Sequence, residues 1–265
     1  MPAPYRLVAT DLDGTLLRSD GTVSDRTRAA LALVEGAGAA LVLVTGRPPR
    51  WMRPVAAGTG HRGVAICCNG AVRYDMHEEA VLEQRSIEPQ ALLDVVTALR
   101  AAIEQVSFAV EYGTGFAREA SYRSRWGAGP DDPVVADLDE LAHRPAVKLL
   151  MRHPSSGPDE LLARARDVLG DAATCVHSST EGMLEISAPG VTKASALASL
   201  AAEHGIDPRH VIAFGDMPND LPLLAWAGHA VAVANAHAEV LAAAHEVTGS
   251  NDDDGVASVL ERVFG

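Results

Sequence analysis

The feature that most constrains this chain is a short apolar segment near its start that runs directly into two carboxylates. The hydrophobic run Leu7–Ala9 is followed by Asp11 and Asp13, and then by the turn-forming Gly14. A short apolar run of this kind is typical of a buried strand, and strand residues two apart point to the same side. The two carboxylates are therefore expected together where a strand ends, which is where ligands bind in open α/β sheets.

Two carboxylates this close repel each other unless a cation, a shared proton or water relieves the repulsion. Ligands that are all oxygen atoms favour a hard ion, with Mg²⁺ as the first candidate. A calcium-binding EF-hand loop begins similarly, but it needs glycine at its sixth position and glutamate at its twelfth. Leu16 and Thr22 occupy those positions here, so the calcium-loop interpretation fails.

The next segments alternate between strand and helix patterns. Ser24 is a predicted N-cap for a helix over Asp25–Ala37. The continuous apolar run Leu41–Val44 is typical of a parallel strand covered on both faces, and Val64–Cys68 is a further apolar run. This alternation predicts an α/β fold with a doubly wound, Rossmann-like parallel sheet.

From about Leu82 the pattern changes. The following stretch contains a helix near Pro89–Gln105, a segment around Phe108–Phe116, a polar stretch Ser121–Pro133, an apolar run Val147–Met151, a helix near Asp159–Leu169 and a final run Leu184–Ile186. Because this stretch has an apolar periodicity of its own, it reads as an inserted α+β domain. We expect residues 83–188 to form that domain and residues 1–82 and 189–265 to form the core.

The sheet pattern then resumes. The predicted elements are a helix over Lys193–His204, strands at Val211–Phe214 and Ala230–Val233, a helix capped by Asn235, and a terminal helix whose apolar stripe contains Val256, Val259, Leu260 and Val263. The acidic run Asp252–Asp254 is expected to be a solvated turn.

Charge and cysteine content exclude several classes of protein. The chain has 22 basic and 35 acidic residues and a net charge of −13, so nucleic acid and anionic membranes are not expected as partners. A phosphorylated substrate would also be repelled, and its site therefore needs a local cation and buried donors. Cys67, Cys68 and Cys175 are odd in number and lack zinc-ligand spacing, so we expect core thiols.

No signal-peptide pattern precedes the first predicted strand, and no apolar stretch approaches the roughly 20 residues of a membrane span. These observations predict a cytoplasmic protein.

Four predicted strand or helix ends carry polar residues in a familiar order. Asp11-Leu12-Asp13-Gly14-Thr15, Thr45, Lys193 and Gly215-Asp216-Met217-Pro218-Asn219-Asp220 resemble the four motifs of the haloacid dehalogenase-like (HAD) superfamily. The inserted domain lies between the second and third motifs, which is the position of a type 2 cap (C2B-like). Thr45-Gly46-Arg47, Asn69-Gly70, Gly190-Val191-Thr192-Lys193, Asn235-Ala236 and Asp254-Gly255-Val256 are similar to the Cof-type phosphatases in particular.

This resemblance implies a catalytic set of Asp11, Asp13, Thr45 and Lys193. Asp11 would attack phosphorus and form an aspartyl-phosphate, and Asp13 would act as general acid and base. Mg²⁺ would be held by Asp11, the backbone carbonyl of Asp13, and Asp216. Asp220 also belongs to the expected metal set, either as a ligand or as a residue that orients Lys193 or a metal-bound water.

The resemblance also implies a substrate-binding set. The backbone N–H groups of Leu12 and Gly46, together with the side chain of Asn219, would hold phosphoryl oxygens; Arg47, Asn69 and Glu185 complete the expected set. The cap residues Glu111, Arg118 and His177 could also contact the substrate, although each competes with the simpler interpretation of a solvated surface side chain.

The implied function is a Mg²⁺-dependent phosphatase acting on small phosphorylated metabolites, with sugar phosphates as the first class to test. Asp13 favours hydrolysis or mutase chemistry over a long-lived phosphoenzyme. A hexose phosphomutase and a non-catalytic regulator that binds a phosphorylated metabolite remain as alternatives. We expect a monomer or a weak homo-oligomer.

Overall fold

The computed structural model describes residues 5–113, 115–123, 134–135, 137–178 and 181–265. The chain divides into two compact units, residues 1–83 with 192–265 and residues 84–191. The domain boundaries predicted from the sequence lie between residues 82 and 83 and between residues 188 and 189. Most of the predicted polar stretch Ser121–Pro133 lies outside the described residues.

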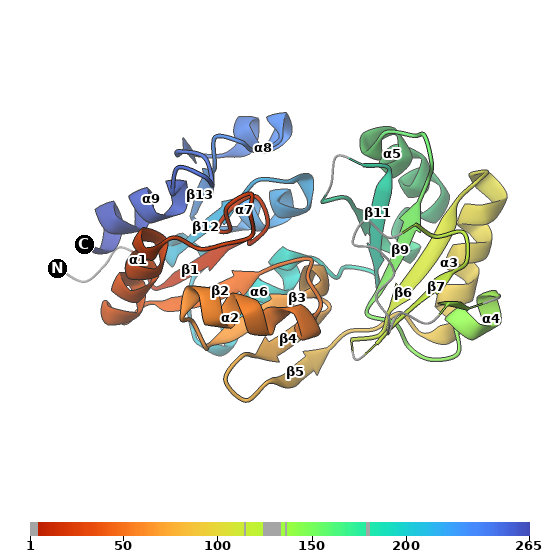
Figure 1. Ribbon diagram of the computed structural model, residues 1–265, viewed down its shortest axis with the longest axis horizontal. Coiled ribbons are helices and arrows are strands. Elements are labelled where there is room, and N and C mark those ends of the chain that lie inside the picture. Colours follow the sequence, from red (N-terminus) through yellow and green to blue (C-terminus); the bar gives the residue numbers. More distant parts are fainter. Residues whose placement is uncertain (1–4, 114, 124–133, 136, 179–180) are drawn as a thin grey trace. The chain divides into compact units, whose positions relative to one another are not determined.

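One sheet runs through the first unit (Figure 1). Its strands are β1 (Leu7–Thr10), β2 (Ala40–Val44), β3 (Val64–Cys67), β4 (Val72–Asp75), β5 (Ala80–Gln84), β12 (Val211–Gly215), β13 (His229–Ala232) and β14 (Glu246–Val247). Within the described part of the chain their order is β14-β13-β12-β1-β2-β3-β4-β5. Neighbouring strands from β14 to β3 are parallel, and β4 is antiparallel to β3.

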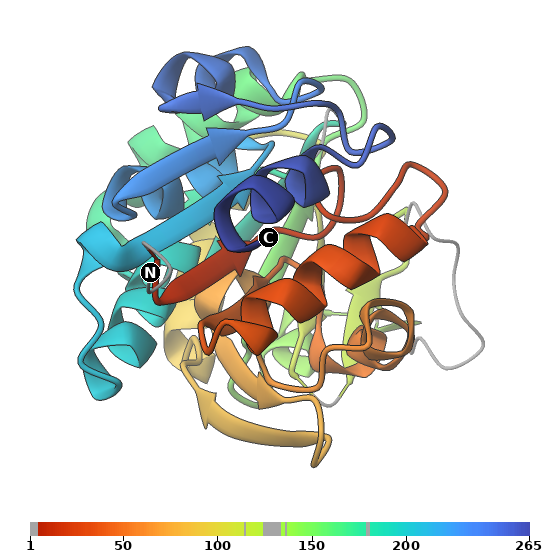
Figure 2. The ribbon, with the colours of Figure 1, turned by 90° about the vertical axis from the view of Figure 1, so that its left-hand side faces the viewer.

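Helices cover this sheet because its central strands are apolar on both faces. The helices of the first unit are α1 (Asp25–Gly36), α2 (Met52–Thr59), α6 (Lys193–Glu203), α7 (Leu221–Trp226), α8 (Ala238–Ala243) and α9 (Gly255–Phe264). Leu7 and Ala9 of β1 belong to one buried cluster with Leu197 of α6 and Leu223 of α7. The intervening Val8 is also fully buried, and α1 and α9 lie side by side (Figure 2).

The second unit has a sheet of its own. Its strands are β6 (Ser107–Glu111), β7 (Phe116–Glu119), β8 (Val134–Val135), β9 (Lys148–Arg152), β10 (Thr174–Val176) and β11 (Met183–Ser187), and its helices are α3 (Pro89–Ala102), α4 (Leu138–Leu141) and α5 (Pro158–Leu169). The described strands follow the order β10-β11-β9-β6-β7-β8. All neighbouring pairs are antiparallel except β7 and β8.

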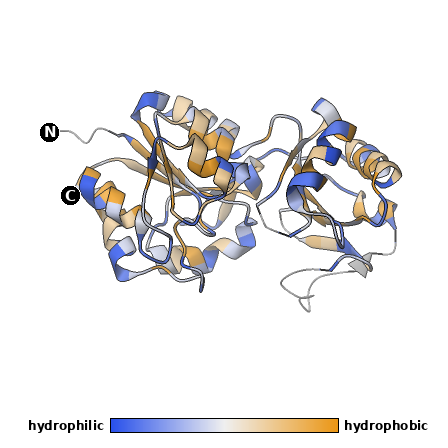
Figure 3. Ribbon diagram, turned by 90° about the horizontal axis from the view of Figure 1, so that it is seen from above, coloured by the Kyte–Doolittle hydropathy of each residue, from blue (hydrophilic) through white to orange (hydrophobic). Residues whose placement is uncertain are grey.

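A separate hydrophobic core fills this unit. Phe108 and Met151 point from the sheet into a buried cluster with Leu92 of α3 and Leu161 of α5. Figure 3 shows that hydrophobic residues gather within each unit separately. Because strand residues alternate, Glu111, Lys148 and Glu185 lie on the sheet face opposite to that core.

The structure confirms the predicted α/β fold with a parallel-rich sheet. Ser24 caps α1, since its hydroxyl accepts a hydrogen bond from the N–H of Thr27 at 2.9 Å. The three cysteines are buried and form no disulfide bond. Within the described residues, no helix combines the length and the apolar character needed to cross a membrane.

Three expectations differ from the structure. The sequence did not predict the hairpin β4–β5, whose second strand is exposed along its length. Asn235 does not cap a helix, because α8 begins at Ala238 and His237 is its N-cap. Asp254 does not belong to a solvated turn: its carboxylate is 12% exposed and pairs with Arg18 at 2.9 Å.

We predict that the isolated segment 84–191 folds, because its core is built from its own residues. It should unfold cooperatively in urea, with a free energy of about 5 kcal/mol, as followed by circular dichroism. Phe108→Ala should lower that free energy by about 3–5 kcal/mol and abolish the transition. Phe116→Ala, at a partly exposed position, is the control and should cost less. A segment that shows no cooperative transition would contradict the independence of this unit.

Candidate active site

Polar residues from several strand ends meet at one edge of the first sheet. Asp11 follows β1, Thr45 follows β2 and Asp216 follows β12. These three strands are adjacent and parallel, so their carboxyl ends point to the same edge. The N–H of Asp11 donates to the carbonyl of Phe214 at 3.0 Å and extends the pairing to the point where the site begins.

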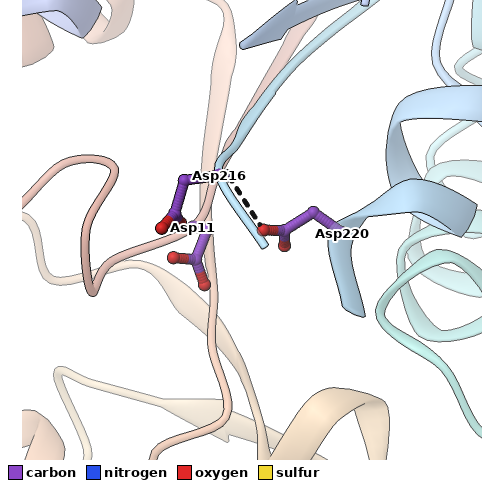
Figure 4. A group of neighbouring side chains, drawn as sticks. All are labelled: Asp11, Asp216 and Asp220. Carbon is purple, nitrogen blue, oxygen red and sulfur yellow. Dashed lines mark hydrogen bonds between the residues drawn. The ribbon is translucent and has the colours of Figure 1, made fainter. Parts of the chain in front are cut away.

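Three buried aspartates form the centre of this site. One oxygen from each of Asp11, Asp216 and Asp220 lies within 4.8 Å of the others. Figure 4 shows the carboxylates of Asp11 and Asp216 close together, with Asp220 approaching from the turn that follows β12. The residues are only 5%, 5% and 1% exposed, so water does little to screen their repulsion.

Lys193 supplies positive charge to this cluster. Its ammonium nitrogen lies 2.5 Å from Asp11 Oδ1 and 2.7 Å from Asp220 Oδ1. Lys193 is the first residue of α6, and the preceding Thr192 caps that helix in a reciprocal pair of hydrogen bonds with Ser195. The cap fixes where the helix begins, and therefore fixes where the lysine enters the site.

The charges of this group do not balance. Burial opposes the positive charge of Lys193, but the carboxylates of Asp11 and Asp220 prevail and raise its pKa. Burial raises the pKa of Asp11 well above its usual range, and Asp220 and Asp216 add to that rise against the opposing effect of Lys193. Burial and then Asp220 raise the pKa of Asp216 to about 7. One ammonium is thus too little positive charge for three carboxylates.

The arrangement fits a small hard cation between Asp11 and Asp216. Asp220 Oδ1 binds Lys193, and its Oδ2 accepts hydrogen bonds from the N–H groups of Asp216 and Met217, both at 3.1 Å. Asp216 Oδ1 accepts from the hydroxyl of Thr15 at 2.7 Å. Asp11 Oδ2 and Asp216 Oδ2 make none of these bonds. Asp220 is therefore placed to hold Lys193 and the turn more than to bind a metal directly.

Gly14 makes room for this geometry. A Cβ at this position would lie 2.4 Å from Asp216 Oδ2, and the φ angle of Gly14 is +82°. Side-chain-bearing residues rarely adopt this conformation, so both the backbone and the available space require glycine beside the proposed cation position.

Asp13 lies at the same edge but outside the buried cluster. Its carboxylate is 56% exposed and forms a two-pronged ion pair with the guanidinium of Arg47, with Nε–Oδ2 at 2.8 Å and Nη2–Oδ1 at 2.5 Å. Asp13 is close to Asp11 in the chain, and its charge adds to the rise in the pKa of Asp11 and Asp216 after the effects of burial and of the nearer charged groups. This position suits a group that exchanges protons while Asp11 does other work.

The other predicted phosphate-binding residues of the first unit lie in tight turns around Asp11. Leu12 is buried, and its carbonyl accepts from the N–H groups of Thr15 and Leu17. Thr45 is fully buried, and its hydroxyl oxygen accepts from the N–H of Arg47 at 3.0 Å. Gly46 stands between these two residues, within the turn that this bond closes.

Asn69 and Asn219 contact each other directly. The side-chain amide of Asn219 donates to Asn69 Oδ1 at 3.1 Å, and both residues are buried. Asn219 belongs to the short turn Pro218–Asp220 after β12, and Asn69 belongs to the turn Cys68–Gly70 after β3. The sequence predicted both as substrate contacts but did not predict that they pair.

The predicted cap residues lie in the second unit. Glu185 accepts from Lys148 at 2.6 Å and from the hydroxyl of Ser178. Glu111 and His177 are buried, which excludes the solvated-side-chain interpretation for both, and His177 pairs with Asp159 at 2.8 Å. Arg118 is partly buried and donates to the carbonyl of Tyr122 at 3.2 Å.

Sequence reasoning singled out Asn235 and Asp254 as parts of family-like segments but did not predict that this region holds the loop after Asp13. Asn235 donates to the carbonyl of Gly14 at 2.8 Å and accepts from the N–H of Asn251 at 2.9 Å. Asn251 donates to the carbonyl of Leu17 at 2.9 Å. The available signal was compositional: the chain has only four asparagines, and all four bind loops of this site.

Ion pairing and hydroxyl bonds complete this attachment. Arg18 forms a two-pronged ion pair with Asp254, and both the N–H and the hydroxyl of Ser19 donate to Asp252, at 2.9 and 2.7 Å. The loop after Asp13 is therefore fastened to the segment that precedes α9, more than 200 residues away in the chain.

Comparison with known proteins finds phosphatases among the relatives of this chain. The chain is 30% identical over 266 residues to the pyridoxal phosphate phosphatase YbhA of Escherichia coli, across 96% of this chain and 97% of that protein. It is 27% identical over 276 residues to the 5-amino-6-(5-phospho-D-ribitylamino)uracil phosphatase YitU of Bacillus subtilis, across 98% of both chains.

Structural comparison agrees. A haloacid dehalogenase-like hydrolase from Bacillus subtilis matches with a TM-score of 0.82 and 25% identity, over 97% of this chain and 99% of that one. The sequence model of the haloacid dehalogenase-like hydrolase family matches residues 8–260 of this chain. The match spans both units and every segment of the site described above, and the chain therefore belongs to the haloacid dehalogenase-like hydrolase family.

Proposed function

We propose that this chain is a Mg²⁺-dependent phosphatase that hydrolyses small phosphorylated metabolites through an aspartyl-phosphate on Asp11. The observation that carries the proposal is the buried contact of Lys193 with both Asp11 and Asp220, beside Asp216. It supports a centre in which a carboxylate oxygen and a phosphoryl group are held together by positive charge. The family membership and the phosphatase relatives support the same reaction.

In the first step, an oxygen of Asp11 attacks phosphorus while the bond from phosphorus to the leaving oxygen breaks. Asp13 donates a proton to that oxygen, so the leaving group departs as an alcohol. In the second step, Asp13 takes a proton from water as the water attacks phosphorus, and Asp11 is released together with inorganic phosphate. Splitting one hard displacement in this way is the advantage of nucleophilic catalysis, and proton transfer assists each step.

The remaining groups position the phosphoryl oxygens. Lys193, the side chains of Thr45 and Asn219, and the N–H groups of Leu12 and Gly46 serve this role in the proposal. Mg²⁺, held by Asp11, Asp216 and the carbonyl of Asp13, would supply positive charge to the transferring group. Phosphoryl transfer depends mainly on such positioning and charge stabilisation. Asp220 holds Lys193 in place.

The substrate class follows from relatives and from charge. YbhA is named for pyridoxal phosphate and YitU for a phosphorylated ribityl compound. Both names describe small phosphate monoesters, and the net charge of −13 disfavours nucleic acid. We propose sugar phosphates and pyridoxal 5′-phosphate as the first substrates to test. The three cysteines, which form no disulfide bond, favour a reducing, cytoplasmic environment.

Release of inorganic phosphate from p-nitrophenyl phosphate and from a panel of metabolite phosphates, with and without Mg²⁺, tests the proposal. Product analysis separates the alternatives, because a mutase returns an isomeric phosphate. Binding of a panel member without turnover would favour a regulator, and folded, Mg²⁺-supplied protein that neither binds nor turns over any panel member would overturn the assignment.

Replacement of the nucleophile should abolish turnover without unfolding the protein. Asp11→Asn keeps the shape of the side chain but loses the anionic oxygen, and we expect kcat to fall by about 10⁴-fold or more. Steady-state kinetics and circular dichroism measure the two effects. Arg62→Ala, at an exposed loop position, is the control. Normal turnover by Asp11→Asn would rule out Asp11 as the nucleophile.

Replacement of Asp13 should separate the two half-reactions. With an alkyl phosphate, Asp13→Asn should lower kcat by about 10²–10⁴-fold because the leaving group lacks its proton donor. With p-nitrophenyl phosphate, the leaving group needs little acid assistance, so the phosphoenzyme should form and then accumulate. Stopped-flow absorbance should show a burst of p-nitrophenolate. Equal slowing of the first step for both leaving groups would argue against an acid role.

Binding of Mg²⁺ should stabilise the wild-type fold and depend on Asp216. At 100 times its Kd, a ligand that binds only the folded state adds about 2.7 kcal/mol to the free energy of unfolding. Thermal unfolding with and without MgCl₂ measures this effect, which Asp216→Asn should largely remove. Asp253→Asn makes the same change at an exposed carboxylate and should keep the full shift. An equal Mg²⁺ shift in wild type and Asp216→Asn would refute the placement.

A further inference from the structure

The turn after β3 has an unusual backbone. Cys68, Asn69 and Gly70 are three consecutive residues with positive φ angles, of 50°, 56° and 107°. Residues with side chains rarely adopt this region, and asparagine tolerates it better than most. Strained backbone persists where surrounding contacts enforce it, and it gathers at functional sites. The contacts of this turn therefore need an explanation.

Two backbone hydrogen bonds fasten the turn to the segment after β2. The N–H of Cys68 donates to the carbonyl of Arg47, and the N–H of Asn69 donates to the carbonyl of Thr45, both at 3.0 Å. The turn therefore fixes the main chain on both sides of Gly46, within the segment that the proposed function assigns to phosphate binding.

The side chain of Asn69 reaches a third segment. Its Oδ1 accepts from the Asn219 amide at 3.1 Å, and the two residues are 3% and 4% exposed. In the sheet, β1 and β2 separate β3 from β12, the strand that precedes Asn219. The bond therefore joins turns from two strands that are not neighbours in the sheet, and strand pairing alone does not produce it.

Gly70 presses the same turn against the start of α6. A Cβ at Gly70 would lie 2.2 Å from the carbonyl oxygen of Thr192 and 3.2 Å from the backbone nitrogen of Lys193. Only glycine permits this approach to the residue that brings the lysine into the site. The three-residue turn thus contacts the segments of Thr45, Asn219 and Lys193 at once.

We propose that Asn69 is a positioning residue, which orients the Asn219 amide toward the phosphoryl group instead of contacting the substrate itself. The sequence analysis expected Asn69 to bind substrate; the geometry assigns that contact to Asn219 and the support of it to Asn69. The kinetic consequence rests on the proposed phosphatase function, whereas the orientation of Asn219 does not.

Asn69→Gly is the informative variant, because glycine accepts the left-handed backbone while the side-chain amide, with the oxygen that binds Asn219, is removed. We expect inorganic phosphate, measured by calorimetry with MgCl₂ present, to bind about tenfold more weakly, the scale of one lost hydrogen bond. Glu79→Gly is the matched control: Glu79 has a φ of 51° and lies in the exposed turn between β4 and β5. Its phosphate affinity should equal that of wild type.

A double-mutant cycle with Asn219→Ala separates positioning from direct contact. If Asn69 acts through Asn219, Asn69→Gly has no further effect on phosphate affinity once Asn219 is alanine. If the two losses multiply, Asn69 contacts the phosphate itself and the proposal is wrong. An Asn69→Gly protein that binds phosphate as tightly as wild type also overturns it.

A measurement without ligand keeps this inference independent of the enzymatic assignment. The chain has only four asparagines, so the side-chain amide signal of Asn219 can be identified by NMR as the one lost in Asn219→Ala. Asn69→Gly should shift that signal, and Asn69→Asp, which retains an acceptor oxygen, should leave it near its wild-type position. An unmoved signal in Asn69→Gly would overturn the proposal. If Asn69→Gly shifts this signal as expected but the wild-type protein shows no phosphatase activity, the result would count against the proposed function alone.

Discussion

Placing an ammonium group among three buried carboxylates is the constraint on which the rest of this structure depends. A buried charge without a partner is costly, and Lys193 also stands at the end of α6 where the helix dipole opposes a cation. Asp11 and Asp220 offset both effects by direct contact. Burial, and then the neighbouring carboxylates, raise the pKa values of Asp11 and Asp216 against the opposing effect of Lys193. A cation held by these carboxylates would relieve their mutual repulsion.

The sheet makes this arrangement possible because parallel strands carry their chain ends to a common edge. β12, β1 and β2 are neighbours, so Asp216, Asp11 and Thr45 are brought together by main-chain hydrogen bonds alone. Lys193 and Asn69 do not follow from strand pairing. Lys193 depends on the capped start of α6, and Asn69 on a turn whose backbone lies in the left-handed region. The site thus combines a robust sheet edge with two local devices that set finer distances.

The loop after Asp13 is held from the far end of the chain. Asn235, Asn251, Asp252 and Asp254 all bind it, through its carbonyls, its N–H groups or its side chains. Hydrogen bonds to charged partners are about twice as strong as neutral ones, and several of them on one short loop restrict its motion. Asp13, which enters the site from this loop, consequently has a supported position even though its own side chain is exposed. The C-terminal segment therefore supports the site, and the N–H of His237 also donates to the carbonyl of Asp216 at 2.8 Å.

Much of the fold and the centre of the site followed from local pattern. Continuous apolar runs predicted β1, β2, β3 and β12 because strands covered on both faces need apolar side chains at every position. The hairpin β4–β5 lacks such a continuous run, since apolar and polar residues are mixed in β4 and β5 is exposed, and it was missed. Asp11, Asp216 and Lys193 were identifiable because the motifs that contain them resemble those of the haloacid dehalogenase-like superfamily and stand at predicted strand or helix ends.

Partnerships between side chains had no such local signal. The sequence by itself determined the α/β class, the inserted α+β segment and the set of polar residues at the strand ends, since these are written in short-range hydrophobic and motif patterns. Only the tertiary structure decided which side chains pair: Asn69 with Asn219, Arg47 with Asp13, and Arg18 with Asp254. It also decided that the carboxylate of Asp220 accepts hydrogen bonds from Lys193 and from two backbone N–H groups. Most of these contacts join residues far apart in the chain, and their geometry depends on how loops from different strands pack over one sheet edge.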